Sequence, residues 1–159
     1  MKYIPYFLTL LFITACGSSI PTKEVVEVKV SDRCFQYGEK AMGSVAVKWA
    51  QRSSMPDDGE GWRLIGLASH KNLSELGFTV DEIKSYAKEI YFTDFMSDME
   101  RDAISFRYYM RFACDLKEKG ISALDISVVK EKIGNCWRSG SNSTEQCISR
   151  VMYENTNTL

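Results

Sequence analysis

The sequence lacks most of the motifs from which a reaction could be identified. It contains a single histidine, and no Cys-x-x-Cys pair, glycine-rich phosphate loop or Gly-x-Ser-x-Gly motif. It also lacks an excess of either charge, because 20 lysines and arginines stand against 21 aspartates and glutamates. Without a basic surplus, nothing indicates nucleic acid or a charged lipid surface as a partner. These absences predict no cofactor and no metal site.

Long apolar runs are also missing, with one partial exception at the start of the chain. Tyr3 to Ala15 are almost wholly apolar and follow a single charge, Lys2. This run is shorter than the roughly 20 apolar residues that a membrane-spanning helix needs. A positive start followed by a short apolar core is typical of a secretory signal peptide. The run leads into Ile13-Thr14-Ala15-Cys16, which is an aliphatic residue, two small residues and a cysteine.

Residues 1–16 resemble the signal peptide and lipobox of bacterial lipoproteins. In that family the cysteine receives a diacylglycerol, the signal peptide is removed in front of it, and the new amino terminus is acylated, for example with palmitate. The resemblance implies that residues 1–15 are a signal peptide and that Cys16 carries the lipid. Several acyl chains would anchor the protein stably, because each buried methylene contributes about 0.8 kcal/mol.

The residue after the cysteine bears on the location. Gly17, in place of an aspartate, is similar to the outer-membrane signal of enterobacterial lipoproteins. The resemblance therefore implies a lipid-anchored protein of the bacterial envelope, in the outer membrane and facing the periplasm. An ordinary signal peptide with a chance cysteine is the alternative.

Four cysteines remain for the mature chain: Cys34, Cys114, Cys136 and Cys147. An even number in an exported chain predicts two disulfides, with free buried thiols as the alternative, and allows three pairings. The polar segment 138–142 would turn the chain back, so we favour Cys136–Cys147, a bond that would contribute about 2–3 kcal/mol. The remaining bond, Cys34–Cys114, would join the start of one helix to the end of an antiparallel one.

Apolar residues recur at helical spacing from Asp32 onward and predict an all-α fold. We expect a compact bundle of five to six helices, stapled by the two disulfides. Three of the predicted helices have both ends assigned: Asp32 to about Ser53, Trp62 to Ser69, and about Asp98 to Lys119. Three more are assigned by their starts, at the capping box that begins at Thr79, at Asp125 or Ser127, and at Ser143. Residues 70–78 are predicted to be irregular.

The chain accordingly divides into four segments. Residues 1–15 are the signal peptide, and residues 16–32 are an extended, lipidated tether. Alternating Val26, Val28 and Val30 allow one short edge strand in this tether. Residues 33–155 form the helical domain, and residues 156–159 form a disordered tail.

Isolated carboxylates and the histidine are weak candidates for chemistry. Asp94, Asp98 and Asp102 have i, i+4 spacing, which allows a metal site but favours a solvated acidic face. The segment 57–61, Asp-Asp-Gly-Glu-Gly, lacks the ligand spacing of an EF-hand and is interpreted as a turn. His70, in a predicted irregular segment without a nucleophile motif, is interpreted as a surface residue.

Aromatic and arginine residues gather in the predicted helix that follows Asp98. Tyr108 and Phe112 lie four residues apart beside Arg107 and Arg111, on a face shifted from the apolar stripe. Tyrosine, phenylalanine and arginine occur often at protein interfaces, so these four residues are the candidate partner surface. The favoured alternative is a wide core, in which a central helix buries most of its circumference.

Three hypotheses of function follow. The first is a lipid-anchored envelope protein, not an enzyme, that binds another protein as immunity proteins, inhibitors and assembly components do. The second is a structural or small-ligand-binding lipoprotein. The third is a cell-wall hydrolase that uses Glu60, Glu75, Glu82 or Glu100 and needs two carboxyl groups of different environment in one cleft. A large apolar cavity would favour the second hypothesis, and a flat aromatic–arginine patch would favour the first.

Overall fold

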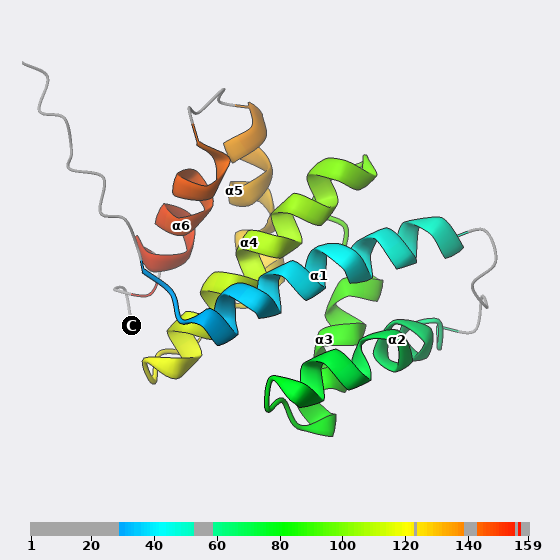
Figure 1. Cartoon of the computed structure of the whole chain (residues 1–159). Coiled ribbons are helices and arrows are strands. Elements are labelled where there is room, and N and C mark those ends of the chain that lie inside the picture. The colour runs from blue at the N-terminus through cyan, green and yellow to red at the C-terminus, as the bar shows by residue number, and fades with distance from the viewer. Residues whose placement is uncertain (1–28, 53–58, 123, 139–142, 155, 157–159) are drawn as a thin grey trace, which may run out of the picture.

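The structure is a computed structural model that describes residues 29–52, 59–122, 124–138, 143–154 and 156. Within these ranges the chain forms six α-helices and no strand (Figure 1). The helices are α1 Asp32–Gln51, α2 Trp62–Glu75, α3 Val80–Phe92, α4 Met99–Glu118, α5 Ile126–Arg138 and α6 Thr144–Glu154. The predicted all-α fold is therefore confirmed. None of these helices is both long and apolar enough to cross a membrane.

Two long helices form the centre of the fold. Helices α1 and α4 run antiparallel beside each other, with the α2–α3 pair on one side and the α5–α6 pair on the other (Figure 1). All six helices contribute buried side chains to one core, and each large apolar side chain buried there stabilises the fold by about 1.5–3 kcal/mol. Its fully buried members include Val45, Ile65, Leu73, Tyr86, Ile90, Phe106, Met110, Leu116, Ile133, Ile148 and Met152.

Both predicted disulfides are present. Cys34 at the start of α1 is bonded to Cys114 near the end of α4, with Cα atoms 5.4 Å apart. Cys136 in α5 is bonded to Cys147 in α6, with Cα atoms 5.6 Å apart. The first bond links α1 to α4, the two central helices, and the second links α5 to α6.

Side-chain caps set the starts of several helices. The predicted capping box is confirmed: Thr79 Oγ1 accepts from the backbone N–H of Glu82, and the Glu82 carboxylate accepts from the backbone N–H of Thr79. Asp98 caps α4, and Ser31 caps α1, which begins at Asp32 as predicted. A serine hydroxyl serves here because it accepts the backbone N–H of Cys34.

Helix α2 continues beyond its predicted end at Ser69. It runs from Trp62 to Glu75, so His70 lies in a helix and not in an irregular segment. The helix continues because Leu73 extends the buried face to which Ser69 belongs, four residues further along. The chain turns instead at Gly77, whose φ of 80° lies in the left-handed region that favours glycine.

Several predicted segments lie outside the described residues. They are the signal peptide with Cys16, most of the tether 16–32, the Asp57–Asp58 part of the predicted turn, the loop 139–142 and residues 157–159. Of the three tether valines only Val30 is described, and it does not lie in a strand.

Candidate functional site

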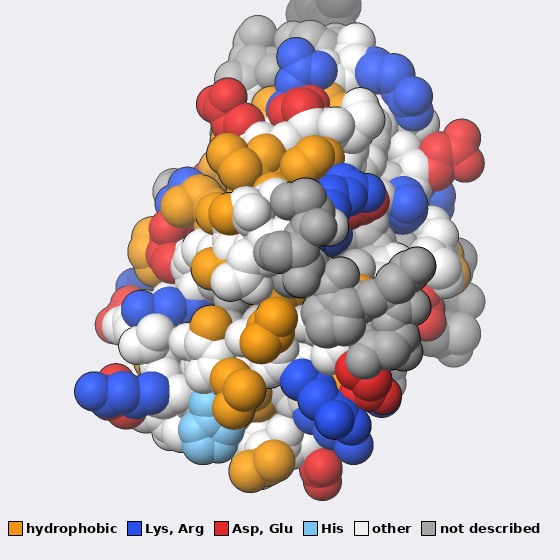
Figure 2. Space-filling model, turned by 90° about the vertical axis from the view of Figure 1, so that its right-hand side faces the viewer, with side chains coloured by type: hydrophobic (Ala, Val, Ile, Leu, Met, Phe, Trp, Pro, Cys, Tyr) orange, Lys and Arg blue, Asp and Glu red, His pale blue; other side chains and the backbone are white. Residues whose placement is uncertain are grey.

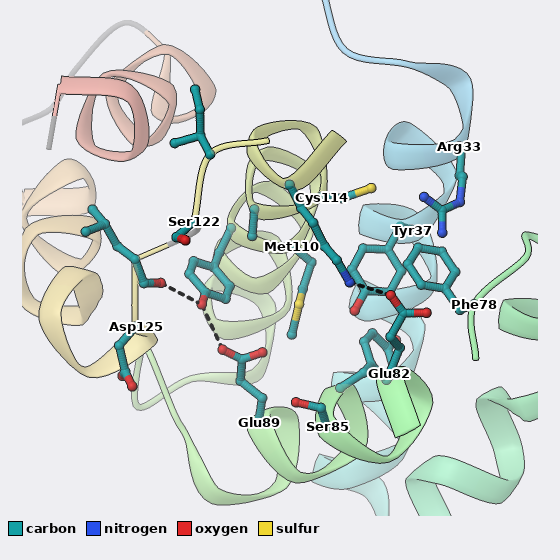
Figure 3. A pocket seen from close by; sticks show the side chains of 16 residues that line it. Arg33, Tyr37, Phe78, Glu82, Ser85, Glu89, Met110, Cys114, Ser122 and Asp125 are labelled. Atoms are coloured by element: carbon teal, nitrogen blue, oxygen red, sulfur yellow. Dashed lines mark hydrogen bonds and ion pairs between the residues drawn. The ribbon is translucent and has the colours of Figure 1, made fainter. Parts of the chain in front are cut away.

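A cleft of about 500 Å³ opens between α1, α3, α4 and the link from α4 to α5 (Figure 3). Its walls come from segments far apart in the sequence, from Arg33 in α1 to Asp125 after α4. Small-molecule sites in proteins typically occupy about 300–1,000 Å³. The cleft is therefore the candidate functional site of the described part of the chain.

One end of the cleft is built from aromatic rings. Tyr37 stacks on Phe78 with ring centroids 4.3 Å apart, and its ring lies 5.3 Å from that of Tyr86. The hydroxyl of Tyr86 is hydrogen-bonded to Ser44 Oγ at 2.8 Å, whereas the hydroxyl of Tyr37 has no hydrogen-bond partner among the described residues. Burial raises the pKa of Tyr37, so its hydroxyl stays protonated. This end offers apolar ring edges and one unused hydroxyl.

The other end of the cleft holds a largely buried carboxyl group, that of Glu89 in α3. Tyr109 of α4 donates its hydroxyl to Glu89 Oε1 at 2.7 Å, and the same hydroxyl lies 3.2 Å from the carbonyl oxygen of Leu124 (Figure 3). A phenol has one proton and does not donate fully to two acceptors. Burial of the carboxyl group, and secondarily the charge of Asp125, raises the pKa of Glu89.

Protonation of Glu89 satisfies all three groups of this network. The protonated carboxyl donates to the Tyr109 oxygen, and Tyr109 then donates to the Leu124 carbonyl. The second oxygen of Glu89, Oε2, has no hydrogen-bond partner among the described residues. In this arrangement Oε2 is left as an unused acceptor.

Charged residues on the rim of the cleft are paired with one another. Lys117 of α4 donates to Glu82 of α3 (Figure 3). Arg33 forms an ion pair with Glu118 at 3.1 Å. The hydrogen bond from Lys117 is the largest cause that lowers the pKa of Glu82 to about 2. Asp125, at the exposed edge, accepts from Ser127 in the first turn of α5. Among the described residues, each cation on the rim therefore already has a carboxylate partner.

Sequence reasoning named Glu82 but missed Tyr37, Glu89 and Tyr109. One signal was available for Glu89, because it lies three residues after buried Tyr86 and next to the buried stripe of α3. A carboxylate at that position borders the core. The other two residues became candidates only when the fold brought α1, α3 and α4 together.

The predicted partner surface lies largely inside the protein. Phe112 is 2% exposed and Arg111 is 4% exposed, so the expectation of exposed side chains is wrong for these two residues. Their burial agrees with the alternative of a wide core, because α4 packs against α1 on one side and against α6 on another. Tyr108 and Arg107 are partly buried and lie at the edge of this cluster.

The arginines of that surface are held by carboxylates of this chain. Arg107 Nε and Arg111 Nη2 donate to Glu39 Oε1 at 2.6 and 3.2 Å, and Arg111 Nη1 donates to Glu145 Oε1 at 2.7 Å. The Arg111 guanidinium also lies 4.3 Å from the ring centroid of Phe35, which is 43% exposed. The arrangement ties α1, α4 and α6 together and leaves Phe35 as its most exposed ring.

Asp94, Asp98 and Asp102 do not form the expected solvated acidic face. Helix α4 begins only at Met99, so Asp94 precedes it and Asp98 is its cap. Asp102 is completely buried and accepts three N–H groups: Phe95 N at 2.6 Å, Met96 N at 3.3 Å and Trp49 Nε1 at 3.0 Å. It therefore holds the α3–α4 link against α1.

Lys48 completes this polar cluster. It is 4% exposed, and its ammonium donates to Asp94 at 2.5 Å and lies 3.8 Å from Asp102. Asp94 also forms an ion pair with Arg52 at 3.1 Å. The three aspartates are thus divided among an ion pair, a helix cap and a buried acceptor.

His70 lies on the surface, as expected for a residue without catalytic partners. It is exposed on α2, and Figure 2 shows its pale-blue side chain on the face that also carries apolar side chains. Leu64 and Leu67 on the same helix are 42% and 75% exposed. Within the described residues, one group of possible metal ligands comes together, Cys34, Cys114 and Glu118, but the two sulfur atoms are bonded to each other.

Comparison of the chain with protein-family models, with curated proteins and with solved structures finds no match.

Proposed function

We propose that the protein is a lipid-anchored binding protein of the bacterial envelope that holds a small molecule in the cleft. The observation that carries this proposal is the pair of unused polar atoms in a cleft of about 500 Å³, the Tyr37 hydroxyl and Glu89 Oε2. The protein itself uses neither atom in a hydrogen bond among the described residues, so a ligand that enters the cleft can bond both without displacing an internal hydrogen bond.

The binding role is tested by nuclear magnetic resonance. The full chain, with both disulfides oxidised, is ¹⁵N-labelled and titrated with mixtures of small neutral, cationic and anionic molecules. Binding in the cleft predicts shifts in the amides of residues 82–89 and 109–117 and little change in α5 and α6. Shifts confined to other helices, or no shifts with any mixture, would count against the proposal.

The anchor is proposed from the lipobox resemblance of residues 13–16. The two disulfides support an oxidising compartment, where such bonds persist. We expect Cys16→Ser to move the protein from the membrane fraction to the soluble fraction, or to leave it unprocessed. A Cys16→Ser variant that is still acylated and membrane-bound would refute the anchor.

A protein-binding role is the second candidate, and Phe35 is the observation that favours it. This ring is 43% exposed and covers Arg111, beside Tyr108. A pull-down from envelope and secreted fractions tests this role, with Phe35→Ala as the interface variant. Phe112→Ala is unsuitable, because that side chain is 2% exposed and its loss would disturb the core. A stoichiometric partner that is lost with Phe35→Ala would establish this role.

The hydrolase hypothesis receives less support from the geometry. Glu82 and Glu89 both line the cleft, but they lie seven residues apart on α3, which is about 10 Å along the helix axis. Glycosidases place their two carboxyl groups about 5–9.5 Å apart. Both oxygens of Glu82 are also occupied, one by Lys117 and the other by Thr79.

A further inference from the structure

We infer that the ligand of the cleft is an uncharged saccharide, bound through its hydroxyl groups by Tyr37 and Glu89. This inference rests on the proposed binding role of the cleft and names the ligand class of that same site. Three properties of the cleft lead to it: the balance of its charges, the complementary hydrogen-bonding capacity of its unused groups, and the apolar surface between them.

The balance of charges selects against ions. The two cations of the rim, Lys117 and Arg33, are already paired with Glu82 and Glu118. An anionic ligand would have to displace these carboxylates, because no other cation lines the described cleft. A cationic ligand would meet two carboxyl groups outside the existing ion pairs: Asp125, which is at the exposed edge and already accepts from Ser127, and Glu89, whose charged form is disfavoured by burial. An uncharged ligand leaves every ion pair intact.

The unused polar atoms are complementary to hydroxyl groups. Tyr37 presents a hydroxyl that donates one hydrogen bond, and Glu89 presents Oε2 as an acceptor, because only its Oε1 is bonded to the Tyr109 hydroxyl. A sugar hydroxyl both donates and accepts, so the hydroxyls of a saccharide are suited to both atoms. Ser85 and Ser122 add two exposed hydroxyls on the opposite walls of the cleft (Figure 3).

The surface between the polar atoms is apolar. Met110 and Ala113 of α4 line the cleft, together with the ring edges of Tyr37 and Phe78 (Figure 3). A sugar ring has C–H groups as well as hydroxyls, so it buries C–H surface here while its hydroxyls reach the two ends. A purely apolar ligand would leave the Tyr37 and Glu89 oxygens without hydrogen-bond partners and would bind less tightly for that reason.

The test uses three neutral disaccharides and two charged ones as probes. The neutral probes are maltose, cellobiose and N,N′-diacetylchitobiose, and the charged probes are the cationic glucosamine disaccharide and the anionic galacturonic acid disaccharide. The full chain, with its disulfides oxidised and in a detergent without sugar, is titrated with each probe. Affinity is measured by calorimetry, and the contact site by ¹⁵N amide shifts.

Two conservative variants report on the two polar atoms. Tyr37→Phe keeps the ring stack and removes only the hydroxyl, and we expect it to weaken saccharide binding about fivefold, the effect of one lost hydrogen bond. Tyr91→Phe is its matched control, because Tyr91 is also partly buried, has no hydrogen-bond partner among the described residues and does not line the cleft. The affinity of Tyr91→Phe for each saccharide should equal that of the parent protein.

Glu89 is tested by a pair of substitutions. In Glu89→Gln the amide N–H₂ donates to Tyr109, and its carbonyl oxygen faces the cleft, so binding should be retained. Glu89→Ala removes the acceptor, and we expect about fivefold weaker binding or more. The urea midpoint of each variant is measured in parallel, so that a loss of folding is not mistaken for a loss of binding.

The outcomes separate this inference from the proposal on which it rests. Binding of at least one neutral disaccharide at the cleft, weakened by Tyr37→Phe and not by Tyr91→Phe, supports both. Binding at the cleft by charged probes alone, or by non-saccharide molecules alone, overturns the saccharide class but keeps the binding role. Neutral saccharides that bind with equal affinity to Tyr37→Phe and Glu89→Ala overturn the assigned contacts. No binding by any molecule overturns both.

Discussion

Substitution of Gly38 by alanine is predicted to damage the central helix pair more than its small size suggests. A Cβ atom at Gly38 would lie closer than 3.0 Å to the backbone carbonyl oxygen of Arg107 and 3.0 Å from Arg111 Cβ. The Arg107 oxygen belongs to the backbone of α4, so rotation of a side chain does not relieve the clash. The Cys34–Cys114 disulfide, one helical turn away, also resists separation of α1 from α4.

The magnitude follows from two opposing effects. Overpacking in a close contact costs about 1–3 kcal/mol, and the backbone nature of this contact places it near the upper value. Alanine recovers about 1 kcal/mol of helix propensity relative to glycine. We therefore expect Gly38→Ala to lower the free energy of unfolding by about 2 kcal/mol, the difference between these values.

The same helix supplies a matched control. Gly43 is exposed, and an added Cβ there meets nothing within 4 Å. Gly43→Ala should therefore raise the free energy of unfolding by about 0.5–1 kcal/mol through propensity alone. Urea unfolding followed by circular dichroism, with the disulfides oxidised, measures both variants. Equal stability of the two variants would refute the close approach of α1 and α4 at Gly38.

Three further predictions concern stability. Asp102→Ala leaves three N–H groups without an acceptor and should lower the free energy of unfolding by about 3 kcal/mol in the same assay, whereas a loss below about 1 kcal/mol would contradict its role. Replacing Cys136 and Cys147 together with serine should cost about 2.8 kcal/mol by loop entropy, and unchanged urea midpoints would exclude the bond. The pKa of Glu89 is raised, so the stability that its protonation supplies is complete below pH 4.5 and is lost as the pH rises through the raised value. The stability of Glu89→Gln relative to the parent should therefore increase above pH 4.5, and a constant difference from pH 4 to pH 9 would contradict the raised pKa.

A further prediction concerns acid. The pKa of Glu82 is lowered from 4.5 to about 2, so its charged form contributes stability that is present above pH 4.5 and is lost as the pH falls toward 2. Glu82→Gln should accordingly be less stable than the parent at pH 6, and the two should converge near pH 2. Thermal unfolding over this pH range makes the comparison, and parallel curves would refute the assignment.

Local features of the sequence predicted the fold well. The capping box at Thr79, the helix spacing and the Cys136–Cys147 pairing each involve residues close in the chain, and the structure confirms each of them. The end of α2 was misjudged because Gly77, and not the polar residues after Ser69, ends the helix. The position at which a helix ends depends on the burial of its last residues as well as on their helix propensity.

The site was predicted less well, because it depends on distant pairings. Phe112 and Arg111 resemble interface residues in sequence, and only the packing of α4 between α1 and α6 shows that they are buried. Glu89 and Tyr109 are ordinary helix residues until α3 and α4 bring them to 2.7 Å. A pattern of spacing within one helix does not contain this information.

The position of the first disulfide determines how the protein responds to mechanical load. Cys34 lies three residues after Ser31, the cap of α1, and its bond leads directly to Cys114 near the end of α4. A pull on the segment that precedes α1 therefore passes through the sulfur–sulfur bond and bypasses the chain between these cysteines, whose sequence separation is 80. Helices α2 and α3 lie wholly within this bypassed region, so the α3 wall of the cleft carries no tension along its backbone while the ends of the chain are drawn apart.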